Sequence, residues 1–269
     1  INSRHAASAP DKHIIIFYLL LMLIVCFCSM KKGNSMKNNE KVTSQSDKRG
    51  LLLIIAATLV ACIVMGVVDA VIRPGYIAKS LVKATLFIGL PLICRIINKD
   101  ISPFSYLRPN LRGILLSLAL GVAVLAIILG SYFALRGIFD FSGVTKSLES
   151  NVGVTKDNFL FVAAYISLIN SFLEEFFFRG FAFLTLCRFV SCQAAYIFSS
   201  AAFTLYHIAI MIGWFSPAVF VLIMIGLFAG AVIFNYIDQK NGSIYSSWLI
   251  HMGANFAINT IGYILFTTS

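Results

Sequence analysis

The stretch Ser171-Phe-Leu-Glu-Glu-Phe-Phe-Phe-Arg-Gly180 places two carboxylates and one guanidinium inside an apolar run that covers residues 158–186. On membrane-insertion scales, a charge at the centre of a helix costs about 2.5–3.5 kcal/mol. Three unpaired charges would cost on the order of 8–10 kcal/mol, which is comparable to the stability of a whole domain. The stretch therefore predicts a helix whose charged groups find partners inside a bundle.

Spacing within this stretch separates its two glutamates. Glu175 and Arg179 stand at i and i+4 with the acid N-terminal to the base, the order that favours an ion pair on a helix. Glu174 is rotated by about 100° from Glu175, and Asn170, one turn earlier, shares its face. We predict a structural ion pair between Glu175 and Arg179, and a carboxylate at Glu174 that is free to face elsewhere.

The composition of the whole chain agrees with a membrane environment. Hydrophobic residues make up 59% of the 269 positions and charged residues only 12%, whereas soluble domains carry about 25% charged residues. Backbone groups in lipid must be hydrogen-bonded within their own segment, so each long apolar run is expected to be a helix. Seven such runs cover residues 51–72, 81–97, 113–135, 158–186, 194–212, 217–237 and 243–266.

The predicted fold is therefore all-α: a polytopic transmembrane helical bundle of about seven spans plus an N-terminal hydrophobic segment. That segment, residues 14–29, is short for a span, which needs about twenty residues. We assign residues 1–50 to this segment and a basic linker. Residues 1–29 fit either a signal-like or marginal transmembrane segment or a stretch outside the native product, and both alternatives stay open. The next unit, residues 51–154, is expected to hold accessory transmembrane helices.

Charge and cysteine content exclude two other classes of protein. The net charge of +10 comes largely from basic residues in short connections beside apolar runs, which is typical of cytoplasmic loops rather than of nucleic-acid binding. The six cysteines lack the paired CxxC spacing of a zinc site, and most sit in or beside apolar runs. We expect no nucleic-acid partner, and we expect the cysteines to act as small hydrophobic residues.

Two histidines lie in other apolar runs. His207 falls in the fifth run, while His251, Asn255 and Asn259 repeat at i, i+4 and i+8 in the seventh and form a polar stripe. A single such histidine is usually explained by a hydrogen bond between helices. Ionisable residues from three helices of one bundle, together with Glu174, instead indicate a functional site.

These groups suit the hydrolysis of an amide. Glu174, held beside His207, could act as the general base that deprotonates water. His251 and Asn255 lie one turn apart and could donate hydrogen bonds to the developing oxyanion. An alternative remains open, because Glu174, His207 and His251 could supply a three-ligand zinc site.

The order Glu174-Glu175-x-x-x-Arg179, Phe203-x-x-x-His207 and His251-x-x-x-Asn255 resembles the CAAX-protease and bacteriocin-processing (CPBP) family. This family is also called the Abi or type II CAAX prenyl endopeptidase family. The resemblance covers roughly residues 155–266, so residues 155–267 are expected to form the catalytic transmembrane domain. It implies an all-helical endopeptidase embedded in the membrane.

The resemblance also implies roles for the motif residues. Glu174 would be the water-activating base and His207 would assist it, while His251 and Asn255 would stabilise the oxyanion. Glu175 and Arg179 would form the structural pair. No cofactor is favoured, although zinc is possible, because Asn255 is a poor zinc ligand and a good oxyanion donor.

The expected substrate is a membrane-anchored protein or peptide, and the expected location is the plasma membrane of a bacterium. Relatives in eukaryotes cleave prenylated CAAX proteins, and bacterial relatives are linked to bacteriocin maturation or self-immunity. The main alternative is a non-catalytic membrane scaffold, or a bacteriocin self-immunity protein, that acts by binding a partner. Transporters, which predict paired broken helices and an inverted repeat, fit the sequence less well.

One small-residue motif adds a packing expectation. Gly226 and Gly230 form a GxxxG in the sixth run, a spacing that lets two membrane helices approach closely. We expect it to pack against a neighbouring helix of the same bundle rather than against a second protomer.

Overall fold

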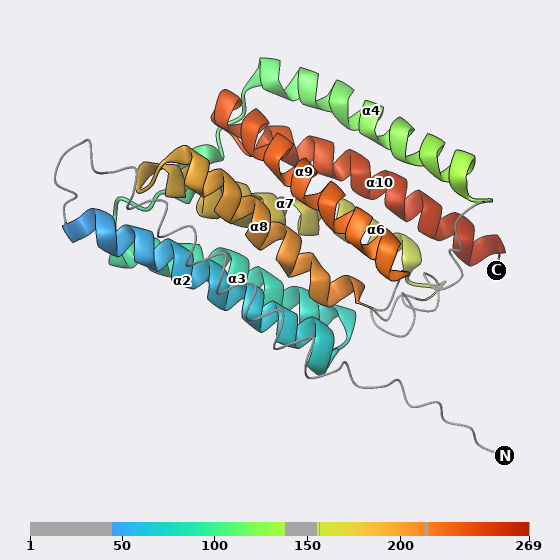
Figure 1. Ribbon diagram of the computed structural model, residues 1–269, viewed down its shortest axis with the longest axis horizontal. Coiled ribbons are helices and arrows are strands. Elements are labelled where there is room, and N and C mark those ends of the chain that lie inside the picture. Colours follow the sequence, from blue (N-terminus) through green and yellow to red (C-terminus); the bar gives the residue numbers. More distant parts are fainter. Residues whose placement is uncertain (1–44, 138–154, 156, 213–214, 269) are drawn as a thin grey trace.

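The computed structural model describes residues 45–137, 155, 157–212 and 215–268, and these form an all-helical bundle with no strand in the described ranges (Figure 1). Seven helices are long and apolar enough to cross a membrane, which confirms the predicted fold class. Their ends differ from the predicted runs by a few residues. The N-terminal hydrophobic segment lies outside the described residues.

The helices follow one another along the chain. The seven long helices are α2 (Gln45–Val67), α3 (Tyr76–Ile97), α4 (Leu111–Leu135), a helix over Phe159–Arg188, α8 (Cys192–Met211), α9 (Pro217–Asn241) and α10 (Tyr245–Thr268). A π-helical turn (Val68–Ile72) continues α2, and a 3-10 turn (Pro103–Tyr106) precedes α4.

The helix over Phe159–Arg188, here called the central helix, is not uniformly α-helical. It begins as α6 (Phe159–Tyr165), passes through a π-helical stretch (Ile166–Asn170) into α7 (Ser171–Glu174), and continues as a second π-helical stretch (Glu175–Thr185) before a final 3-10 turn (Leu186–Arg188). π-Helical turns inside α-helices are rare and frequent at functional sites. Here the two π-helical stretches flank the short segment that ends in Glu174.

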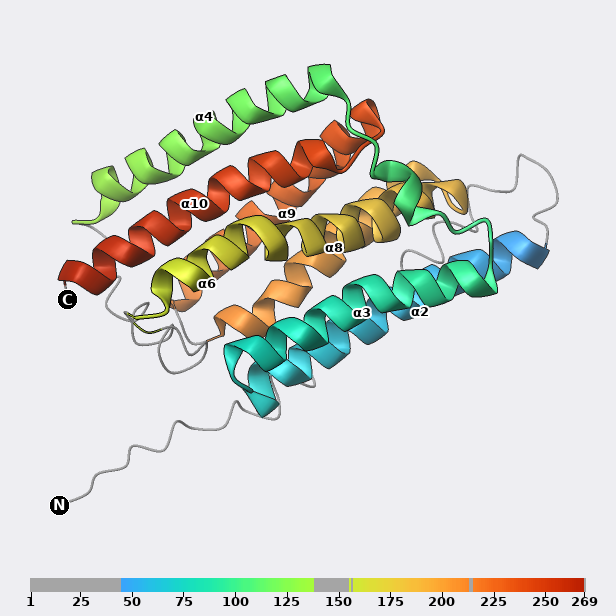
Figure 2. The same ribbon diagram turned by 180° about the vertical axis from the view of Figure 1, so that it is seen from behind.

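The central helix lies between α10 on one side and α3 on the other (Figure 2). Helix α8 packs against the second π-helical stretch and against α2, while α9 packs against α8 and α10. Helix α4 lies along the outer side of α10 (Figure 1). Residues from α3, α8 and α10 can therefore all reach the central helix.

Aromatic side chains fill the centre of the bundle. Phe87 of α3 stacks on Phe177 of the central helix, with ring centroids 4.3 Å apart, and meets Phe178 edge-on at 5.6 Å. All three are fully buried. Because each large ring removes 150–250 Å² from solvent, this cluster holds α3 firmly against the central helix.

The turn between α2 and α3 carries a buried ion pair of its own. Asp69, in the π-helical turn that ends the first span, pairs with Lys79 in the first turns of α3. Between them, Arg73 adopts a left-handed backbone conformation with φ 47° and its Nε donates to the Ala70 carbonyl oxygen. The pair joins the end of the first span to the start of α3, the helix that carries Lys83.

The expected packing of the GxxxG motif is wrong. A Cβ added at Gly226 or Gly230 would meet nothing within 4 Å, since this part of α9 faces away from the bundle. The close glycine contact lies elsewhere: a Cβ on Gly253 of α10 would stand 2.4 Å from the Gly121 carbonyl oxygen of α4. Small residues do allow two backbones to approach here, but through a pair on separate helices.

We expect Gly253→Ala to destabilise the protein by roughly 1–3 kcal/mol, the usual cost of overpacking, because its Cβ would strike backbone that cannot rotate away. The measurement is thermal unfolding of the detergent-solubilised protein. Gly226→Ala is the matched control and should unfold at or above the wild-type temperature, since its Cβ meets open space. Equal melting temperatures for the two variants would contradict the close contact between α4 and α10.

Candidate active site

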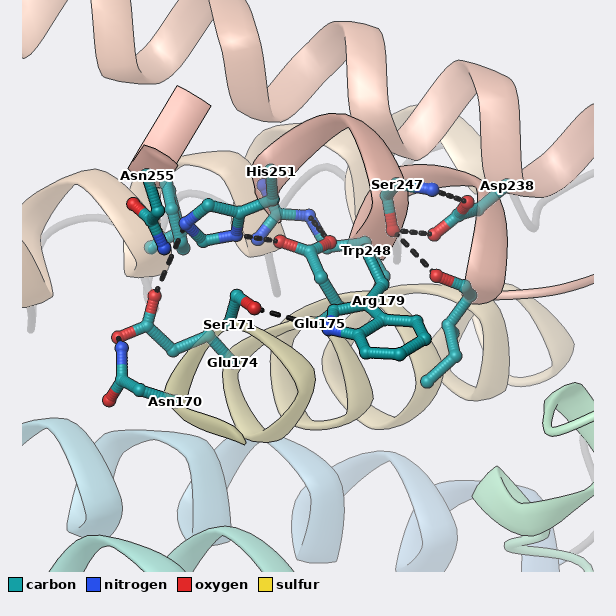
Figure 3. A network of polar contacts seen from close by, with 12 residues as sticks. Asn170, Ser171, Glu174, Glu175, Arg179, Asp238, Ser247, Trp248, His251 and Asn255 are labelled. Carbon is teal, nitrogen blue, oxygen red and sulfur yellow. Dashed lines mark hydrogen bonds and ion pairs between the residues drawn. The ribbon is translucent and has the colours of Figure 1, made fainter. Parts of the chain in front are cut away.

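Glu174 is buried, with 2% of the residue exposed, and its two carboxylate oxygens have different surroundings (Figure 3). Oε1 accepts hydrogen bonds from Lys83 Nζ and from Asn170 Nδ2, each at 3.0 Å. Lys83 Nζ also lies 2.6 Å from Asn170 Oδ1, so the three side chains form a closed triangle. Oε2 instead faces His251, whose Nε2 is 3.9 Å away.

Glu175 points to a different set of partners, as its rotation from Glu174 requires. Its Oε2 lies 3.1 Å from Arg179 Nε, so the ion pair that the i, i+4 spacing predicts is present and fully buried. The guanidinium carbon of Arg179 stands 4.1 Å from the ring centroid of Phe203 and 5.2 Å from that of Phe234. Aromatic faces attract a desolvated cation, so both rings stabilise the buried arginine.

His251 links the two glutamates. Its Nδ1 lies 2.7 Å from Glu175 Oε1, while its Nε2 faces Glu174 Oε2 across 3.9 Å (Figure 3). A carboxylate can only accept, so Nδ1 carries a proton and donates it to Glu175. The ring orientation is thereby fixed, with Nε2 directed at the catalytic candidate Glu174. Glu175 therefore both neutralises Arg179 and holds the His251 ring in its orientation.

His207 is oriented by the backbone of its own helix. Its Nδ1 lies 2.8 Å from the Phe203 carbonyl oxygen, an acceptor, so Nδ1 carries the proton here as well. Its ring packs against Phe203 and Tyr206, and it interacts electrostatically with Glu174 and His251. In the neutral ring, Nε2 remains as a hydrogen-bond acceptor.

The polar stripe of α10 binds carbonyl groups of the central helix. Asn255 Nδ2 donates to the Ile166 carbonyl oxygen at 3.2 Å, and Asn259 Nδ2 donates to the Ala163 carbonyl oxygen at 3.2 Å. A backbone carbonyl has two lone pairs and can accept such a second bond. An amide nitrogen has two N–H groups, so Asn255 keeps a second donor beside the one that reaches Ile166.

Two further contacts fix the start of α10 and hence the position of His251. Asp238, at the end of α9, accepts from the Ser247 backbone N–H at 3.0 Å and from its hydroxyl at 2.6 Å. A carboxylate at a helix N-terminus is favoured by the exposed N–H groups and the helix dipole. Trp248 Nε1 donates to Ser171 Oγ at 3.1 Å, which ties the first turn of α10 to the segment that carries Glu174 (Figure 3).

The residues singled out from the sequence therefore come together only in part. Glu174, Glu175, Arg179 and His251 are in direct contact, His207 interacts electrostatically with Glu174, and Asn255 binds a backbone carbonyl of the same central helix. Sequence reasoning missed Lys83. Lys83 is the third residue of the apolar run 81–97. A lysine so close to the start of a run looks like one of the basic residues that commonly flank a membrane span, so the sequence offered little reason to place it in the site.

The side chains considered for zinc do not fit a metal site. In the parts of the chain that the structure describes, no three His, Cys, Asp or Glu side chains gather as a group that could hold a metal ion. The Lys83 ammonium already lies 3.0 Å from Glu174 Oε1, so a zinc ion on that carboxylate would meet a like charge.

Comparison with known families finds one that resembles part of the chain. Residues 156–257 match the family described as type II CAAX prenyl endopeptidase Rce1-like, and this segment contains Glu174, Glu175, Arg179, His207, His251 and Asn255. No curated protein and no solved structure matches the chain. The chain is thus a multi-pass membrane protein in which residues 156–257 are similar to a family of CAAX-type membrane proteases.

Proposed function

We propose that this protein is an intramembrane endopeptidase that hydrolyses peptide bonds of membrane-associated proteins or peptides in the plasma membrane of a bacterium. The observation that carries the proposal is the pair Glu174 Oε2 and His251 Nε2, which face each other across 3.9 Å inside the bundle. A carboxylate that can take a proton and an imidazole that can donate one stand on opposite sides of a short gap. Amide hydrolysis needs this combination.

Water activation is assigned to Glu174 with His207. Glu174 Oε1 is occupied by two donors, which leaves Oε2 to accept from a water molecule. His207, whose Nδ1 donates to Phe203, offers Nε2 as the second acceptor for the same water. A water that donates both hydrogens in this way turns a lone pair toward the substrate carbonyl.

The reaction then balances with these side chains alone. As the water oxygen bonds to the carbonyl carbon, one of its protons passes to Glu174 Oε2, and the carbonyl oxygen becomes an oxyanion. His251, protonated on both nitrogens, donates Nε2–H to the oxyanion while Nδ1–H stays on Glu175, and the second N–H of Asn255 adds another donor. When the C–N bond breaks, Glu174 returns its proton to the leaving amine.

Glu174→Gln tests the assignment of the base, because the amide keeps the shape of the side chain and removes its proton affinity. We expect new N- and C-termini of membrane proteins in cells that express the wild type and none of these in cells that express Glu174→Gln at the same level. The measurement is mass spectrometry of membrane-proteome termini. Asp100→Asn makes the same chemical change at an exposed site and should leave the termini as in the wild type.

The opposite result would favour the alternative function. If the termini are identical in all strains and Glu174→Gln still rescues the phenotype of a deletion, the protein works by binding a partner. It would then be a membrane scaffold or a self-immunity protein, with Glu174 in a structural role.

Asn255 and Asn259 offer a matched pair for the oxyanion role. Both side chains hydrogen-bond the central helix from α10. Asn255 donates to the Ile166 carbonyl oxygen at 3.2 Å. Asn259 donates to the Ala163 carbonyl oxygen at 3.2 Å and to Ser167 Oγ at 3.0 Å, so alanine at Asn259 removes at least as much structural contact as alanine at Asn255. We expect Asn255→Ala to lower kcat by about 10²–10³-fold, the usual effect of losing one oxyanion donor, on a peptide that spans a cleavage site found as above. Asn259→Ala should unfold at lower temperature yet keep its kcat. Equal kcat values for the two variants would remove Asn255 from the mechanism.

A further inference from the structure

Lys83 is a buried cation that lies outside the segment shared with the CAAX-protease family. It belongs to α3, and 5% of the residue is exposed. Its ammonium contacts Glu174 Oε1 at 3.0 Å and Asn170 Oδ1 at 2.6 Å, across 91 and 87 positions of sequence. Burying a lysine in the bundle would be costly without such partners, so its position depends on Glu174.

The surroundings of the ammonium hold it in place. The ring centroids of Tyr206 and Phe87 lie 5.2 and 5.9 Å from Nζ, so aromatic faces cover the side that the two oxygens leave open. Phe87, one turn further along α3, is itself stacked on Phe177 of the central helix. The helix that carries Lys83 is therefore anchored to the helix that carries Glu174 by packing that does not involve the ion pair.

The triangle of Lys83, Asn170 and Glu174 decides which carboxylate oxygen is available for chemistry. Two N–H donors converge on Oε1, and their removal would let the carboxylate rotate about its terminal torsion. With Oε1 held, Oε2 is the oxygen that faces His251.

The charge of Lys83 matters as much as its geometry. A carboxylate in a low-dielectric interior without a counter-charge takes up a proton, and a protonated glutamate cannot act as a base. Two other cationic groups of the site are bound to Glu175: Arg179 is paired with its Oε2, and the doubly protonated His251 donates Nδ1–H to its Oε1. Among the described residues, Lys83 is therefore the cation that hydrogen-bonds Glu174, with Nζ 3.0 Å from Oε1, whereas His251 Nε2 lies 3.9 Å from Oε2.

We propose that Lys83 is a positioning residue of the active site: it keeps Glu174 ionised and turns its Oε2 toward the reacting water. This inference rests on the proposed role of Glu174 as the base. It also gives the helices at residues 51–154 a direct part in the reaction, because the residue that prepares the base comes from α3.

The kinetic test compares Lys83→Met, Lys83→Arg and Lys79→Met on the cleavage-site peptide, with equal amounts of folded protein. We expect Lys83→Met to lower kcat by about 10²-fold or more, with little change in KM, because general-base catalysis is lost while substrate contacts remain. Lys83→Arg keeps the charge and should recover part of kcat. Lys79→Met removes a lysine one turn earlier on the same helix, whose ion pair is with Asp69 instead of Glu174, and should keep wild-type kcat. A wild-type kcat in Lys83→Met overturns the proposal.

A stability test does not depend on proteolysis. Melting temperatures in detergent are compared for the wild type, Lys83→Met, Glu174→Gln and the double variant. Under the proposal, Lys83→Met leaves an unpaired buried carboxylate, so adding Glu174→Gln raises its melting temperature. The control combines Lys79→Met with Glu174→Gln. The changes in melting temperature of these two single variants should add in the double variant, because Lys79 pairs with Asp69 and not with Glu174.

The two tests separate the possible failures. Additive melting shifts for Lys83→Met and Glu174→Gln would overturn the pairing, whatever the protein catalyses. A coupled pair, together with an absence of protease-dependent termini in every strain, would overturn the endopeptidase function and with it the positioning role of Lys83.

Discussion

Charged groups placed in a hydrocarbon environment must meet their counter-charges within the protein, and the arrangement of this bundle follows from that requirement. Glu174, Glu175 and Arg179 are all at most 2% exposed, on a helix that spans the membrane. Arg179 pairs with Glu175 within this helix, and the two glutamates find further partners on α3 and α10, which flank the central helix on opposite sides. Because breaking one buried pair leaves an uncompensated charge, typically at a cost of about 3–5 kcal/mol, neither flanking helix can move away without a large penalty.

Much of the architecture was predictable because the bilayer allows few solutions. Hydropathy alone predicted seven spans, since a segment in lipid has to satisfy its own backbone. The ion pair of Glu175 and Arg179 followed from a spacing of four residues, a contact made within one helix. The family match at residues 156–257 agrees with the three motifs read from the sequence. All of these are local signals, which need no knowledge of how helices pack together.

The features that the sequence did not predict all depend on which helices pack against one another. Lys83 looked like a flanking basic residue because nothing in the sequence says that α3 lies beside the central helix. The GxxxG of α9 was expected to pack inward, yet the close glycine contact joins Gly121 and Gly253, which are far apart in the chain. The contact of Asn255 with the Ile166 carbonyl was equally hidden, because it lies where the central helix departs from α-helical geometry.

That departure also bears on how the central helix matches the thickness of the bilayer. Its 30 residues would extend about 45 Å as a regular α-helix, well beyond a hydrocarbon core of about 30 Å. A π-helical turn closes its hydrogen bond one residue later and so holds more residues in each turn. The stretches Ile166–Asn170 and Glu175–Thr185 thus shorten the helix without removing residues. The longest of the spans in the described ranges is brought closer to its neighbours in length. This lessens the hydrophobic mismatch that a straight helix would have to relieve by tilting.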